Sequence, residues 1–395
     1  MHICLASLRT PVIEHLLIIR EQASRVGVDT CLLDFGQSDF DLTKYGLHSH
    51  YNFNIVHDAK TLADHTLTSC SSAIVLQSPY PEHYPSWFKG HPGFPPFAYF
   101  GYGLPLSDWT VGHFATPLIQ DCTYLLASSH YQVQGYQENV PKAQTQLTGD
   151  PLLYELRRFQ RFNTSSDFNQ DRSTFLWAPH WTRSWTDTSS GYGRFQESCS
   201  NILTWFRNNP SAQLRFRPHP LLGEALHFAL AEKLESNHRE VNKSLNPELD
   251  ISSLSSLRTL LDLPNVTFSD KSLVQDVLES SALVTDGVSI IGYWASTGKP
   301  MLIIRDKDSA NFNNYVIDLI ESVDACAPGK EIENWLDQIY HSPSENLLSR
   351  AIANSIFPTY RKSPVDKWLG TLKPSLLRRL LAPVNRGFAR VTKNS

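Results

Sequence analysis

The sequence lacks the features that mark three large classes of protein. No apolar run approaches the roughly 18–20 residues that a membrane-spanning helix needs, so we expect no such helix. The formal net charge is only −4, which provides no global field to attract nucleic acid. The first residues, MHICLASLRT, lack the basic region and the apolar stretch of a signal peptide. We therefore expect a cytoplasmic protein that binds no nucleic acid.

Paired cysteine motifs are also missing. The six cysteines are scattered along the chain and form no C-x-x-C pair. Cys4, Cys31 and Cys122 lie in apolar, strand-like runs. We expect them to be reduced core residues, as is usual in the cytosol.

The chain does have the length and apolar content for two packed domains, with 395 residues of which 41% are hydrophobic. Strand-like runs alternate with helical patterns, which predicts parallel strands in an α/β fold. In the first part we expect a helix at residues 12–26 and strands at residues 2–6, 30–35, 73–77, 97–100 and 124–127.

A second alternating series follows a polar, turn-rich stretch at residues 161–172, which is the predicted linker. This series predicts helices at residues 196–208 and 273–280, and strands at residues 174–178, 213–217, 266–269, 282–285 and 301–304. We therefore predict two Rossmann-like, doubly wound domains, residues 1–160 and 173–360. Such domains bind ligands in a cleft outside the carboxyl ends of their strands.

Two motifs follow predicted strands of the second domain. RFRPHP places Arg217 and His219 at a strand end, where a guanidinium and an imidazole can neutralise phosphate charge. TDGVSIIG reads as a tight turn and a helix start, whose backbone N–H groups suit a phosphate. In it we expect Asp286 to position a donor hydroxyl, Gly287 to contact phosphate, and Ser289 either to cap the helix or to donate to a phosphate oxygen. The alternative for both motifs is an ordinary structural turn.

Further candidates for chemistry follow other strands. His180 in WAPHW ends the first strand of the second domain, where it would act as a general base, contact phosphate or pack against aromatic rings. In YFGYGLPLSDW, Gly103 permits close approach of an acceptor, and Asp108 is a reserve base. The D-x-D patterns at residues 39–41 and 306–308 could hold a metal ion, but such pairs are common in loops. We predict no metal site and no cofactor.

Residues 361–395 differ from the rest of the chain. They contain nine Lys or Arg and a single acid, interleaved with leucines and Trp368. This mixture is typical of a segment that lies on an anionic membrane surface. The alternative is a closing helix whose leucines pack on the body of the protein, and Pro374 and Pro383 restrict any single long helix.

Five segments together resemble the CDP-glycerol glycerophosphotransferase family, of the teichoic acid polymerase and primase type. They are, in order, YFGYG (99–103), LTGDP (147–151), WAPHW (177–181), RPHP (217–220) and TDGVSIIGYWASTGKP (285–300). The resemblance implies the GT-B architecture, a CDP-linked donor, a lipid-linked or polymeric acceptor, and peripheral attachment to the inner face of the cell membrane. It also implies that His219 and Ser289 contact the donor phosphates.

The chain departs from this family at two points. Many members carry a His-Gly pair in the first domain as the proposed catalytic base, where this chain has Tyr102-Gly103 on the predicted acceptor side. The usual Asp-Ser-Ser-like run keeps a single serine, Ser289. His180 is then the preferred base, with Asp108 in reserve.

Three hypotheses of function follow. In the first, the protein transfers a polyol phosphate from a CDP-linked donor: an acceptor hydroxyl attacks the distal phosphorus and CMP leaves. In the second, the same fold moves a sugar from a nucleotide donor for surface polysaccharide synthesis. In the third, the chain is a non-catalytic, membrane-associated assembly subunit, which the missing His-Gly pair favours.

Overall fold

The computed structural model describes residues 1–7, 13–35, 53–56, 58–68, 71–81, 84–88, 94–101, 103–108, 110–162, 173–181, 191–219, 222–223, 226, 251–358 and 360–381. Almost all of the predicted linker lies outside these residues, as does the D-x-D pattern at residues 39–41. Among the described residues no helix is both long enough and apolar enough to cross a membrane.

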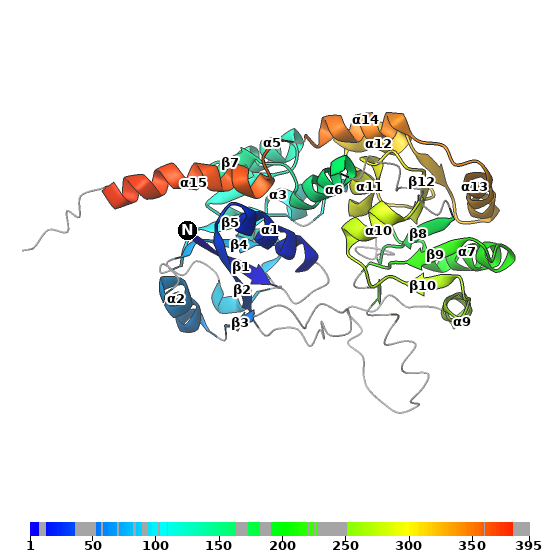
Figure 1. The fold of residues 1–395 in the computed structure, drawn as a ribbon, viewed down its shortest axis with the longest axis horizontal. Coiled ribbons are helices and arrows are strands. Elements are labelled where there is room, and N and C mark those ends of the chain that lie inside the picture. Colours follow the sequence, from blue (N-terminus) through cyan, green and yellow to red (C-terminus); the bar gives the residue numbers. More distant parts are fainter. Residues whose placement is uncertain are drawn as a thin grey trace, which may run out of the picture.

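The first part of the chain forms a parallel sheet of seven strands in the order β3-β2-β1-β4-β5-β6-β7 (Figure 1). Its central strands are apolar on both faces because helices cover both sides. Along β1, Ile3 and Leu5 belong to one buried cluster, whereas Cys4 and Ala6 belong to the cluster on the opposite face. The strands are β1 (His2–Ser7), β2 (Asp29–Asp34), β3 (Phe53–Ile55), β4 (Ser71–Leu76), β5 (Phe97–Phe100), β6 (Tyr124–Ala127) and β7 (Gln144–Leu147).

Two helices from opposite ends of the chain share one face of this sheet. They are α1 (Ile13–Arg25) and α15 (Pro364–Leu381). The other face is covered by α2 (Ala59–Thr68), η3 (Ser86–Phe88), α3 (Thr110–Phe114), α4 (Pro117–Gln120) and α5 (His130–Asn139).

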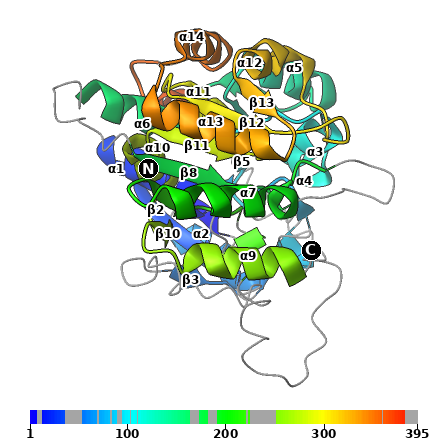
Figure 2. The same cartoon turned by 90° about the vertical axis from the view of Figure 1, so that its right-hand side faces the viewer.

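The second sheet has six parallel strands in the order β10-β9-β8-β11-β12-β13. Figure 2 shows α7, α9 and α13 in front of it, and their apolar side chains fill the buried cluster on that face. The cluster on the opposite face also contains first-domain residues, so the two domains share apolar packing. The strands are β8 (Thr174–Ala178), β9 (Gln213–Phe216), β10 (Val266–Phe268), β11 (Ala282–Thr285), β12 (Met301–Ile304) and β13 (Asp324–Cys326). The helices are α7 (Phe195–Asn208), α9 (Ile251–Leu261), α10 (Leu273–Glu279), α11 (Ser289–Ala295), η4 (Asn314–Val316), α12 (Ile317–Glu321), α13 (Lys330–His341) and α14 (Leu347–Ile356).

The predicted pair of doubly wound α/β domains is confirmed. Strands β5, β6, β8, β11 and β12 begin and end at the predicted residues. The sequence does not predict strands β3, β7 and β13, and each lies at the edge of its sheet. Edge strands are short and need no apolar run on both faces; β7 and β13 are only partly buried.

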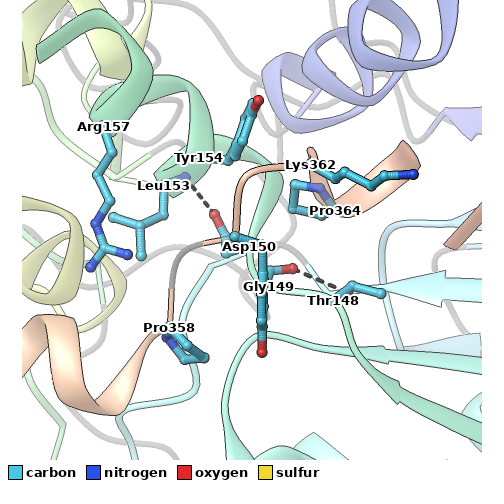
Figure 3. Close-up of a pocket in the computed structure, with 10 residues that line it drawn as sticks. Thr148, Gly149, Asp150, Leu153, Tyr154, Arg157, Pro358, Lys362 and Pro364 are labelled. Carbon is cyan, nitrogen blue, oxygen red and sulfur yellow. Dashed lines mark hydrogen bonds between the residues drawn. The ribbon is translucent and has the colours of Figure 1, made fainter. Parts of the chain in front are cut away.

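Within the part of the chain that the structure describes, the chain passes between the domains at two places. The predicted turn at LTGDP leads directly into α6 (Pro151–Phe162), whose Leu152 and Leu156 pack into the cluster shared by the two domains. Gly149 forms this turn with a φ of +91°, and Pro358 and Pro364 of the returning chain lie beside it (Figure 3). A boundary at residue 160 therefore falls inside a helix that belongs to the domain interface.

The first half of the predicted C-terminal tail is part of the first domain. Trp368 is fully buried, and its ring lies edge-on to that of Phe100 with the centroids 5.6 Å apart. Other buried residues of this half of α15 are Val365, Leu369 and Leu372. Because these apolar side chains pack on the sheet, residues 364–372 offer no apolar face to a membrane. The prediction of a separate surface-binding tail is wrong for this part, and the closing-helix alternative holds.

Candidate active site

A cavity of about 200 Å³ lies between the domains, outside the carboxyl ends of strands from both sheets. Its first-domain wall consists of Glu14, His15, Gly103 and Leu152. Its second-domain wall consists of residues 178–180, 217–219, 273, 287–290 and 293. The predicted interdomain cleft is therefore present, and most of the predicted second-domain site residues line it: His180, Arg217, His219, Gly287 and Ser289.

Two imidazole rings lie against each other on the second-domain wall. His180 follows β8 and His219 follows β9; the backbone N–H of His219 donates to the carbonyl of Pro179 at 2.8 Å, which ties the two loops together. The ring centroids are 4.9 Å apart. Burial lowers the pKa of His180 to about 3, and burial with the neighbouring His180 lowers the pKa of His219 well below its usual value. Both rings are neutral at pH 7, and a neutral imidazole has one N–H to donate.

Asp286 connects the turn after β11 with two neighbouring loops. Its carboxylate accepts the backbone N–H groups of His180 and Arg194. The side chain is 3% exposed, and burial raises its pKa to about 7. Because both oxygens are engaged and Asp286 does not line the cavity, the geometry favours a positioning role over the predicted contact with a donor hydroxyl.

The turn before α11 has fewer available N–H groups than the sequence predicts. The N–H of Gly287 donates to Oγ1 of Thr285 at 2.8 Å, and this hydroxyl donates to the carbonyl of Ala178 at 2.6 Å. Helix α11 has only seven residues, so little of a helix dipole acts here. Ser289 does not cap the helix; it is exposed and lines the cavity, where its hydroxyl can meet a ligand.

Gly103 brings the first domain into close contact with Ser289. It follows β5 and adopts a φ of +74°, in the left-handed region that favours glycine. A Cβ atom at this position would lie 2.7 Å from Oγ of Ser289. The predicted acceptor-side glycine and the predicted phosphate-contacting serine therefore meet across the cavity.

Arg217 is held by carboxylates of both domains. Its guanidinium donates to Asp276 Oδ2 at 2.9 Å and to Glu14 Oε2, on the first-domain helix α1, at 3.3 Å. Glu14 also accepts the N–H of Leu273, at the start of α10, with both oxygens at 2.7 and 2.9 Å. Burial raises the pKa of Glu14, while the charge of Arg217 acts in the opposite direction. A phosphate at Arg217 would share this cation with two carboxylates.

His15 is a cavity residue that sequence reasoning missed. It lies in the first turn of α1 and is 3% exposed, and neither ring nitrogen has a hydrogen-bond partner among the described residues. Nε2 lies 4.0 Å from Oδ2 of Asp150, which also accepts the hydroxyl of Tyr293 at 3.2 Å. Burial lowers the pKa of His15 to about 4 and raises that of Asp150 to about 6. One feature of the sequence could have identified His15: it is a polar residue among the apolar positions that recur with helical spacing in IEHLLII.

Two other residues weighed in the sequence analysis, Asp108 and Asp306, do not line the cavity. Asp108 is exposed and does not line the cavity, which removes the geometric reason for choosing it as a base. Tyr102 lies outside the described residues. Asp306, of the second D-x-D pattern, pairs with Arg194 through two bonds of 2.8 and 2.9 Å, and this partner lowers the pKa of Asp306 to about 2. An arginine thus occupies the carboxylate that a metal ion would need.

Two doubly wound parallel sheets that face each other across a cavity at their strand ends define the GT-B class of fold. Solved structures of this class superpose on nearly the whole chain. A variant of the wall teichoic acid polymerase TagF matches with a TM-score of 0.58 and 11% identity, over 96% of this chain and 90% of that chain. The UDP-GlcNAc 2-epimerase of Neisseria meningitidis, bound to UDP-GlcNAc, matches with a TM-score of 0.54 and 13% identity, over 95% of this chain and 100% of that chain.

A TagF variant soaked with CDPG also matches, with a TM-score of 0.54 and 13% identity over 96% of this chain and 90% of that chain. No protein-family model matches the chain, and no curated protein matches it in sequence. The predicted GT-B fold is thus confirmed, and the family resemblance found in the motifs has its counterpart among the structural neighbours.

Proposed function

We propose that the protein transfers a polyol phosphate from a CDP-linked donor to a hydroxyl of a lipid-linked or polymeric acceptor. The observation that supports this most is the meeting of His180, His219 and Ser289 in one cavity between the domains. The similarity of the fold to TagF, of which one form was soaked with CDPG, makes a CDP-linked donor the first candidate.

In the proposed reaction an oxygen of the acceptor hydroxyl attacks the distal phosphorus of the donor. The new P–O bond forms as the diphosphate P–O bond breaks, CMP leaves with the bonding electrons, and the hydroxyl proton passes to a base. His219 and His180 would each donate an N–H to phosphate oxygens, and the hydroxyl of Ser289 would add a third donor. Positioned donors in a desolvated cleft stabilise the charge that builds up on these oxygens.

His15 is a better candidate for the general base than the predicted His180. It belongs to the first-domain wall, opposite the proposed donor contacts, and its ring nitrogens have no hydrogen-bond partner among the described residues. The carboxylate of Asp150, 4.0 Å from Nε2, would stabilise the imidazolium after proton transfer. His15 and Asp150 would thus supply the base that the family has in its His-Gly pair, where this chain has Tyr102-Gly103.

A nucleotide-sugar glycosyltransferase is the second candidate, because a neighbour of the same fold binds UDP-GlcNAc. In that case attack would occur at an anomeric carbon and a nucleoside diphosphate would leave. The third candidate, a non-catalytic assembly subunit, would bind a ligand in this cavity without turnover.

Calorimetry with CDP-glycerol, CDP-ribitol and UDP-GlcNAc separates the first two candidates, and CMP release in the presence of acceptor separates the first from the third. Under our proposal a CDP-linked donor binds and CMP is released, and His219→Ala weakens both. Binding of UDP-GlcNAc alone, or binding of CDP-linked donors without CMP release by the wild type in the presence of lipid-linked acceptor, would contradict it. His341→Ala is the control, since this ring is exposed on α13, beyond the cavity.

Membrane association is part of the proposal and concerns the end of the chain. The basic residues beyond the buried part of α15 include Arg378, Arg379, Arg386 and Arg390. A cluster of this kind is attracted to anionic lipid at about 1 kcal/mol per residue. We expect the protein to sediment with vesicles that contain anionic lipid, and this binding to be lost when the four residues are changed to Gln. Equal sedimentation of both proteins would exclude this role.

A further inference from the structure

A cluster of cysteine and histidine side chains lies at the end of the first sheet that is opposite the cavity. One ligand atom each of His2, Cys4 and Cys31 lies within 4.8 Å of the other two. Sγ of Cys31 is 3.0 Å from Sγ of Cys4, and Nε2 of His65 is 3.4 Å from Sγ of Cys31. Neither cysteine forms a disulfide.

The register of the sheet brings these residues together. His2 and Cys4 are two positions apart on β1 and therefore point to the same face. Cys31 on β2 is the direct partner of Cys4 in the parallel ladder, so its side chain points to that face as well. Helix α2, which carries His65, lies over this face beside the start of the chain (Figure 1). The convergence thus comes from three segments and not from a short sequence motif.

We propose that His2, Cys4, Cys31 and His65 form a site for a zinc ion, or for another soft divalent cation. Two thiolates and two imidazoles are a donor set that suits tetrahedral Zn²⁺. No carboxylate is required, and this chemistry differs from the oxygen ligands that magnesium and calcium prefer.

The present geometry needs only a small adjustment to accept the ion. Two sulfur atoms bound to one tetrahedral zinc at about 2.3 Å lie about 3.8 Å apart, so the two thiols, now 3.0 Å apart, must separate by roughly 0.8 Å. His65 must approach the other three, which a side chain on a helix beside the sheet can do by changing rotamer. Oγ of Ser71 lies 2.8 Å from Nδ1 of His2 and 3.1 Å from Sγ of Cys4, so this hydroxyl contacts two of the proposed ligands and would have to keep or exchange these contacts when an ion binds.

The location indicates a structural site. The ligands join β1, β2 and α2 at the amino ends of the strands, whereas the cavity lies at the carboxyl ends. A bound ion would fasten the first strand and α2 to the sheet. Binding would also release about two protons per ion at neutral pH, because the two thiols must ionise.

The test uses the full chain without a histidine tag, purified under reducing conditions and loaded with ZnCl₂. We expect about one zinc per chain by mass spectrometry after extensive dialysis, and a tetrahedral thiolate spectrum when cobalt replaces zinc. Cys4→Ser and Cys31→Ser should each lose the tightly held ion. Cys326→Ser is the matched control, since Cys326 is a free, half-buried cysteine on the edge strand of the other sheet, and it should keep the full zinc content.

Two outcomes would overturn the inference. One is a zinc content of the wild type far below one ion per chain after the same dialysis; the other is a Cys4–Cys31 disulfide, detected as two missing thiols when wild type purified without reductant is denatured and titrated. Because both measurements use the wild type, they decide the matter even if a variant does not fold. Neither depends on the proposed transferase activity.

Discussion

The rings of His180 and His219 lie with their centroids 4.9 Å apart and their planes inclined at 59°. At this separation a positive charge on one ring makes protonation of the other less favourable. The pair therefore stays neutral over the physiological pH range. A neutral pair can donate hydrogen bonds to a phosphate without carrying charge into the cavity. The proposed donor site therefore depends on hydrogen bonding by both rings.

His219→Ala should lower kcat for transfer by about 10²–10³, because one positioned donor to the phosphate is lost. His180→Ala should have a similar effect, and the double variant should lose less than the product of the two, since the rings act on one group. Circular dichroism and initial rates, with His341→Ala as control, check this. A His219→Ala enzyme within threefold of wild type would refute the assignment.

His15→Gln should lower kcat by about 10²–10⁴ and leave the dissociation constant of the CDP-linked donor within about twofold, because a general base acts on the acceptor. Steady-state rates and calorimetry on the same preparation separate the two quantities. Loss of donor binding together with kcat would show instead that His15 shapes the donor site.

The stability of the protein should depend on pH through His15. Burial lowers the folded-state pKa of this ring to about 4 from 6.5, so between these values the unfolded chain binds the additional proton. Stability from this residue is therefore present above pH 6.5 and is lost as the pH falls toward 4. The free energy of unfolding of the wild type relative to His15→Gln should decrease by roughly 3 kcal/mol over this interval. Urea unfolding of both proteins at pH 7, 5.5 and 4 measures this difference in free energy. A difference that stays constant over these pH values would contradict the prediction.

Gly103→Ala should disturb the cavity wall by more than the backbone strain that an alanine causes at a positive φ. The substitution places a Cβ atom 2.7 Å from Oγ of Ser289 and also strains a φ of +74°. Gly27 is the matched control, because it has a φ of +73° and a Cβ added there would meet no atom within 4 Å. We expect Gly27→Ala to cost about 1 kcal/mol of stability and Gly103→Ala to cost more and to weaken donor binding at least tenfold. Equal effects of the two substitutions would show that the contact with Ser289 is not tight.

Trp368→Ala should destabilise the protein by about 3–5 kcal/mol, because it empties a fully buried site between α15 and the first sheet. Leu348→Ala on α14 is the control, since that side chain is 62% exposed and should contribute little. Urea unfolding curves decide the matter. A loss below 1 kcal/mol for Trp368→Ala would mean that α15 is not docked as described.

The sequence allows prediction of those parts of the fold whose side chains are buried on both faces. Runs such as FAYF at β5 and MLII at β12 are apolar throughout because helices cover both sides of the sheet. The edge strand QTQL at β7 has no apolar run, because its side chains are only partly buried and can therefore be polar. The tail is ambiguous for a related reason: its leucines and Trp368 fit a membrane surface or a protein surface equally well, and only the tertiary structure decides.

The candidate site was predictable where it depends on strand ends. His180 and His219 follow neighbouring parallel strands, and topology alone brings such loops together. The contributions of Glu14 and His15 were not predictable in this way, because they depend on how the first domain is oriented toward the second. Within one domain, His15 and Gln22 are simply polar residues on the buried face of α1.

The two passages of the chain between the domains run side by side, and Arg157 fastens them: its guanidinium, on α6, donates to the carbonyl of Phe357 at 2.8 Å and to Asn354 on α14. A second link between the domains lies at the cavity itself, where Arg217 pairs with Glu14. A phosphate that drew the guanidinium of Arg217 away from Glu14 would break this link and leave the attachment at Arg157 intact. Occupation of the cavity would then loosen the domain interface on one side only.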